Sequence, residues 1–137
     1  MNAQTKFLGY RVEESLFKMN KLREQAKFSL APKFTCTITG NKERFSSTLF
    51  VELNETTCAG GTPFDIKVAI KGEFLIGADV GEDKSKQLKY SVSTLFPYLR
   101  AFVSTLTTTG GFPPFLLPAI DVDAMAAGIK SDGVIYS

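Results

Sequence analysis

Few residues of this chain could support catalysis or bind a metal, and their spacing does not favour either. The 137-residue sequence contains no histidine, which excludes Ser–His–Asp and Cys–His catalytic sites and metals held by histidine. Asp121 and Asp123 are close in sequence, but both fit the start of a helix, where negative charge is stabilising, and Glu82-Asp83 is expected to be a solvated charge pair before the long helix. We therefore predict that the protein is not an enzyme and has no cofactor or metal site.

The cysteines and the paired glycines also lack a pattern that predicts chemistry. Cys36 and Cys58 form at most one disulfide, and we expect Cys36 in the core and Cys58 as a free loop thiol. Gly60-Gly61 and Gly110-Gly111 have neither the spacing nor the lysine of a phosphate-binding loop. The sequence therefore favours a binding or packing protein.

Composition predicts one soluble domain over residues 1–137. Apolar residues make up 44% and charged residues 22%, the balance of a globular protein. The 16 basic and 14 acidic residues leave a net charge of +2, too small an excess to predict a nucleic-acid partner. No signal peptide and no membrane-spanning stretch is recognised, so we expect a cytoplasmic protein without a membrane partner.

Alternating apolar residues predict four strands between about residues 7 and 77. The clearest run places apolar residues at even positions from Phe64 to Ile76, with polar residues between them. A change of parity within residues 13–16 predicts a bulge in the first strand. Short connections predict an antiparallel sheet.

The second half of the chain is predicted to be helical around an extended segment. Apolar residues recur every three or four positions from Leu88 to Leu106, which predicts a long helix over about 84–109. Pro97 kinks this helix unless it begins only near Ser93. The prolines of residues 110–120 predict an extended crossover loop, followed by a short helix over about 121–130 and a loose tail.

The crossover loop has two possible roles. Its segment from Phe112 to Pro118 carries two phenylalanines and two leucines on a backbone stiffened by three prolines. Such a loop either lies across the sheet as a lid on the core or walls an open apolar groove. Contiguous exposed apolar surface is typical of a binding site.

A family resemblance rests on three segments in fixed order. Leu95-Phe96-Pro97-Tyr98-Leu99-Arg100 is followed by the Gly110–Pro118 crossover and then by Asp121-Val122-Asp123-Ala124. Together they closely resemble the C-terminal half of SecB, the protein-export chaperone. The resemblance covers roughly residues 94–126 and is specific in order, spacing and proline placement.

The resemblance implies a fold, an activity and two sets of residues. SecB-like proteins are α+β, with a four-stranded antiparallel sheet and two helices packed on one face. They assemble as dimers of dimers and bind unfolded polypeptides without ATP in apolar grooves. On this basis the expected client-peptide groove consists of Phe28, Leu30, Phe34, Phe112, Phe115, Leu116 and Leu117. The expected oligomer interface consists of Ile66, Val68, Ile70, Leu95, Leu99, Phe102 and Leu106.

Departures from SecB of the export pathway leave other functions open. That protein is acidic and presents carboxylates to the motor SecA, whereas here Lys67 and Lys71 alternate with Asp65 and Glu73. We therefore expect weak or absent binding to SecA. One alternative is a SecB-like chaperone dedicated to a single client, such as the antitoxin of a toxin–antitoxin system. Another is a small-ligand-binding α+β domain.

Overall fold

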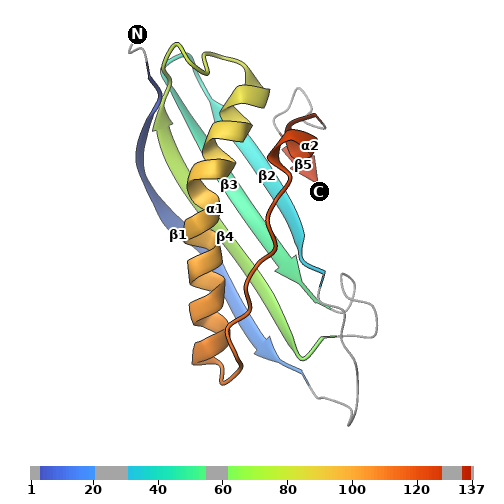
Figure 1. Ribbon diagram of the computed structural model, residues 1–137. Helices are drawn as coiled ribbons and strands as arrows, with labels where there is room; N and C mark the ends of the chain where they lie inside the picture. The colour runs from blue at the N-terminus through green and yellow to red at the C-terminus, as the bar shows by residue number, and fades with distance from the viewer. Residues whose placement is uncertain (1–3, 21–30, 55–61, 128–133, 137) are drawn as a thin grey trace.

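A single antiparallel sheet forms one layer of the molecule (Figure 1). The computed structural model describes residues 4–20, 31–54, 62–127 and 134–136. In spatial order the strands are β1, β4, β3, β2 and β5, and every neighbouring pair is antiparallel. Their bounds are Lys6–Met19 for β1, Lys33–Gly40 for β2, Arg44–Leu53 for β3, Phe64–Leu75 for β4 and Val134–Tyr136 for β5.

Two helices and the crossover loop form the second layer, on one face of this sheet (Figure 1). Helix α1 spans Lys84–Thr109 with Pro97 inside it, and α2 spans Val122–Ala127. Each begins at an aspartate, because Asp83 accepts from the backbone N–H of Ser85 and Lys86, and Asp121 accepts from that of Ala124. The predicted α+β fold, with helices on one face of the sheet, is confirmed.

The core lies between α1 and the inward side chains of the central strands. Phe45 of β3 and Phe74 of β4 stack with ring centroids 4.8 Å apart, and both are buried. Gly72 lets α1 approach closely, since a Cβ at this position would lie 2.8 Å from the Leu95 side chain. Burying each large apolar side chain contributes about 1.5–3 kcal/mol, so this layer dominates stability.

Strand β1 is irregular, as the change of parity predicted. Its register against β4 shifts between Val12 and Glu14, and again between Phe7 and Gly9. Gly9 has a φ of 130°, which other residues rarely adopt. The shift between Val12 and Glu14 was predicted from the sequence, and the shift between Phe7 and Gly9 was not. Each shift re-aims the side chains that follow it, so β1 presents apolar residues to more than one side.

The end of the chain differs from the sequence prediction. A loose tail was expected, but Val134–Tyr136 pairs with Thr35, Cys36 and Thr37 of β2. This strand is too short for an alternation signal. The second helix is described only as far as Ala127, so the rest of its predicted span lies outside the described residues.

Candidate functional site

The crossover loop begins where two glycines end α1. Gly111 has a φ of 91°, the left-handed conformation predicted for one of the pair. Gly110 sits against the ring of Phe17 from β1, because a Cβ there would lie 2.4 Å from that ring. The chain can thus leave the helix directly over the sheet and run back alongside α1 (Figure 1).

Four phenylalanines gather where the loop crosses the sheet. We call Phe17, Phe64, Phe112 and Phe115 the aromatic cluster. Phe64 is its centre, with ring centroids 5.5 Å from Phe17, 5.0 Å from Phe112 and 6.3 Å from Phe115. Such stacked and edge-to-face contacts add to the apolar burial of the rings. The cluster therefore holds the first part of the crossover onto β1 and β4.

A buried threonine fixes the loop to the helix. The backbone N–H of Phe115 donates to Thr107 Oγ1 at 2.9 Å, and the N–H of Phe112 donates to the carbonyl of Thr107 at 3.0 Å. Thr107 is fully buried. Because the loop's own backbone is satisfied in this way, the side chains between its anchors are held in defined directions.

The predicted groove residues separate into buried and exposed positions. Leu117 is 4% exposed and Phe34 is 6% exposed, so both belong to the core, where Phe34 contacts Phe96. Phe112 and Phe115 are half-buried, and Leu116 is 66% exposed. Phe28 and Leu30 lie outside the described residues. The prediction of a groove on Leu117 and Phe34 is corrected, since neither offers surface to a client.

Most of the predicted interface also lies in the core of the single chain. Ile66, Val68 and Ile70 point from β4 into the helical layer, and each is at most 1% exposed. Leu95 and Leu99 meet them from α1 and are fully buried. A side chain covered within one chain has no surface for a second chain. Only the half-buried Phe102 and Leu106 remain of the predicted interface.

The exposed apolar surface lies mainly on β1, which sequence reasoning missed. Of the large apolar side chains exposed in the described residues, five are on this strand, and the others are Tyr98 and Leu116. Tyr98 of α1 packs against Tyr10 of β1 with ring centroids 4.6 Å apart. The broken alternation of β1 was the available signal. The five β1 residues are Leu8, Tyr10, Val12, Leu16 and Met19.

The one described cysteine is placed for packing. Cys36 lies in the core beside Ser47, whose Oγ is 3.4 Å from its sulfur, and Ser47 in turn accepts from Ser91. Burial raises the pKa of Cys36 to about 11, which keeps the thiol protonated and unreactive. Cys58 lies outside the described residues. Within the part of the chain that is described, no three Cys, Asp or Glu side chains are grouped as metal ligands.

Comparison with known families agrees with this geometry. The family model described as preprotein translocase subunit SecB matches residues 14–130. The chain belongs to the SecB family. The match extends the resemblance from the motifs of the second half into the strands of the first.

Individual relatives differ in how much of the chain they share. The uncharacterized protein MJ0357 of Methanocaldococcus jannaschii is 31% identical over 131 residues, covering 91% of this chain and 84% of that protein. The protein-export protein SecB of Xylella fastidiosa is 40% identical over 91 residues, covering 64% of this chain. This chain spans about half of that SecB, with 51% of it matched.

A solved SecB-like structure shares the fold. It is the Rv1957 SecB-like chaperone of Mycobacterium tuberculosis, in complex with a ChAD peptide from the HigA1 antitoxin. The TM-score is 0.66 at 13% identity, over 87% of this chain and 92% of that one.

Among the described helices, none combines the length and apolar character needed to cross a membrane.

Proposed function

We propose that this SecB-family protein is an ATP-independent chaperone that holds unfolded polypeptides through exposed apolar side chains. The observation that carries the proposal is the concentration of such side chains on an open edge strand and the adjoining crossover. Met19 is 61% and Leu116 is 66% exposed, and soluble proteins rarely leave large apolar residues grouped in water without a binding role.

The proposed client surface includes part of the aromatic cluster and the exposed residues beside it. It consists of Met19 at the end of β1, with Phe112, Phe115 and Leu116 of the crossover. Met19 is paired in register with Phe64, the centre of the cluster. An apolar side chain of the client that covers this surface gains about 25 cal/mol per Å² of apolar area removed from water. A client segment that follows β1 adds backbone hydrogen bonds along the open edge.

Self-association is proposed through the other part of β1 and the adjoining side of α1. This assembly surface consists of Tyr10, Val12, Tyr98 and Phe102. It replaces the interface predicted from sequence, most of which is buried in the single chain. Assembly into a dimer of dimers places several client surfaces on one particle. One long client can then bind at several points, which raises its avidity through effective concentration.

The test of this proposal is aggregation suppression without ATP, using several unrelated unfolded proteins. The variant Met19→Ser, Leu116→Ser removes up to about 1.5–3 kcal/mol of potential apolar burial at each position, and we expect roughly tenfold to hundredfold weaker client binding. Leu8→Ser is the matched control, because it makes the same kind of change at an exposed residue outside the client surface. Failure of the unmodified protein to protect any of these unrelated proteins would refute the proposal of a general chaperone.

A second candidate is a chaperone dedicated to one client. The mycobacterial SecB-like structure favours this candidate. This chain matches 92% of the length of that chaperone, which was solved in complex with an antitoxin peptide. The same assay separates the two candidates. A general chaperone protects unrelated unfolded proteins, whereas a dedicated chaperone protects only its own client.

Recruitment by SecA is expected to be weak. Asp65, Lys67, Lys71 and Glu73 are all half-buried and alternate with the core residues of β4, so they share the outer face of the sheet. The two lysines repel a basic partner and partly neutralise the carboxylates. Electrostatic contacts between SecA and this face would weaken further as salt rises. Titration with purified SecA at low salt measures this. A submicromolar complex would contradict the expectation.

A further inference from the structure

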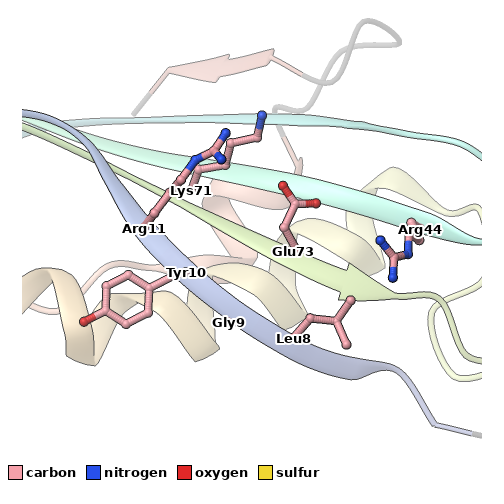
Figure 2. A pocket seen from close by; sticks show the side chains of 7 residues that line it. All are labelled: Leu8, Gly9, Tyr10, Arg11, Arg44, Lys71 and Glu73. Carbon is pink, nitrogen blue, oxygen red and sulfur yellow. The ribbon is translucent and has the colours of Figure 1, made fainter.

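A charged hollow lies on the outer face of the sheet, opposite the helical layer. Its volume is about 360 Å³, and its charged lining consists of Arg11 from β1, Lys71 and Glu73 from β4, and Arg44 from β3. Figure 2 shows Arg11 and Lys71 pointing to the same side of the sheet, while the Tyr10 ring points to the other side, toward α1. Leu8 and Gly9, at the first register shift of β1, complete its edge.

Two of the cations face each other directly. Arg11 and Lys71 are register partners on neighbouring antiparallel strands. Side chains at such positions have Cβ atoms about 4.5–5.5 Å apart, and like charges there destabilise the sheet. Among the residues that the structure describes, the charge of Arg11 is paired with Glu13 alone, in an exposed ion pair of 3.0 Å that contributes little in water. Within the described residues neither Lys71 nor Arg44 forms an ion pair.

The single carboxylate of the hollow is already engaged. Glu73 Oε2 accepts from the Ser46 hydroxyl at 3.1 Å, and Figure 2 shows Glu73 between Lys71 and Arg44. The lining therefore carries three cations and one anion. A carboxylate entering this hollow would meet two guanidinium groups, whose planar donors bind carboxylates with two hydrogen bonds each. It would also separate the two facing cations.

We propose that this hollow binds an acidic peptide segment of a partner protein. The positive charge of the hollow favours carboxylate side chains. Glu73 repels negative charge, so it disfavours a polymer that carries a negative charge on every unit. A nucleic acid is such a chain, and the net charge of +2 is too small to offset this repulsion. The site is separate from the client surface, because the two lie on opposite faces of the sheet. It goes beyond the proposed chaperone activity and does not depend on it.

The experiment is a fluorescence anisotropy titration of the full chain with a short labelled peptide of alternating Glu and Ser. We expect saturable binding that weakens as salt rises. Lys71→Glu should weaken it about tenfold, and Lys71→Gln by less. Lys71→Glu also places a carboxylate opposite Arg11, which favours the fold. The matched control is Lys86→Glu, which makes the same change in net charge at an exposed position of α1. It should alter binding by less than about twofold.

Three results would overturn the proposal. Equal weakening by Lys71→Glu and Lys86→Glu would mean that only net charge matters. Tighter binding of a single-stranded oligonucleotide of matched charge would assign the hollow to nucleic acid. A change of oligomeric mass in Lys71→Glu, measured by light scattering, would make the hollow a contact between subunits. Loss of client protection in the variant Met19→Ser, Leu116→Ser leaves this proposal intact, because both residues lie outside the hollow.

Discussion

The two edges of the sheet differ in whether another strand covers them. At one edge β2 is covered over Thr35, Cys36 and Thr37 by the short strand β5. At the other, the described residues give β1 a partner on one side only, and its 14 residues carry most of the exposed apolar side chains. An uncovered strand edge is a template for pairing, and proteins usually cover it or charge it. The difference indicates that β1 is the edge available to partners.

The open edge is nevertheless protected from indiscriminate pairing. Two register shifts break the regular ladder of donors and acceptors, and charged residues such as Arg11 and Glu14 are spaced along the strand. Bulges and charges of this kind prevent flat edge-to-edge aggregation. The edge thus selects partners that match its irregular shape.

Charging the open edge should have the largest effect. Tyr10→Asp with Val12→Asp places two carboxylates on the proposed assembly surface, where burying an unpaired charge is strongly unfavourable. We expect the dissociation constant of the oligomer to rise at least about a hundredfold, with the fold retained because both side chains are exposed. Light scattering coupled to size exclusion measures the mass.

The control for this change is Thr39→Asp. Thr39 is exposed near the end of β2, two residues beyond Thr37, the last residue paired with β5. If charge at any sheet edge disrupts assembly, Thr39→Asp will lower the mass as well. If the double variant keeps the full oligomer, the assembly surface lies elsewhere.

Sequence periodicity predicted the layers better than it predicted the surfaces. The stripe from Leu88 to Leu106 and the alternation of β4 each require one buried side, and the structure places them against each other. Periodicity does not tell whether that side is covered by the same chain or by another. Ile66 and Leu95 were therefore expected at an interface, although both belong to the core.

Exposure in the crossover could not be read from residue type. Leu116 and Leu117 are adjacent and identical, yet one is 66% exposed and the other is 4% exposed. Their directions depend on the anchor between Thr107 and Phe115, which joins residues eight positions apart. An irregular loop has no period from which such a direction follows.

The beginning of the open edge is held by Thr5, which gives a smaller effect on stability. Its hydroxyl donates to Asp79 Oδ1 at 2.8 Å and accepts from the buried N–H of Gly77 at 3.0 Å. Thr5→Ala leaves that N–H unsatisfied, so we expect the free energy of unfolding to fall by about 1–3 kcal/mol. Chemical denaturation measures the change. Thr5→Ser keeps both hydrogen bonds and should stay close to the unmodified protein.

Asp79 should make the same contact sensitive to acid. The hydrogen bond from the Thr5 hydroxyl holds the pKa of Asp79 below its ordinary value of 3.8. The unfolded chain therefore takes up this proton at a higher pH than the folded chain. The stabilisation is present above the unfolded pKa and is lost as pH falls through the folded pKa. Unfolding of the unmodified protein and of Asp79→Asn, followed against pH, should converge in acid. A constant difference would exclude this contribution.

The covered edge should show the smallest effect on stability. Ile135→Pro removes a backbone donor from β5 and prevents regular pairing with Cys36. Only three residues of β2 lose a neighbour, and the entropy regained by the released segment offsets part of the lost hydrogen bonding, so we expect a change of at most about 1 kcal/mol. Amide exchange at Thr35 and Thr37 should accelerate, and self-association through the newly opened β2 should increase with concentration. Ile135→Val is the matched control. If Ile135→Pro destabilises the protein as much as Thr5→Ala does, then β5 is part of the core and the two edges differ less than their strand pairing indicates.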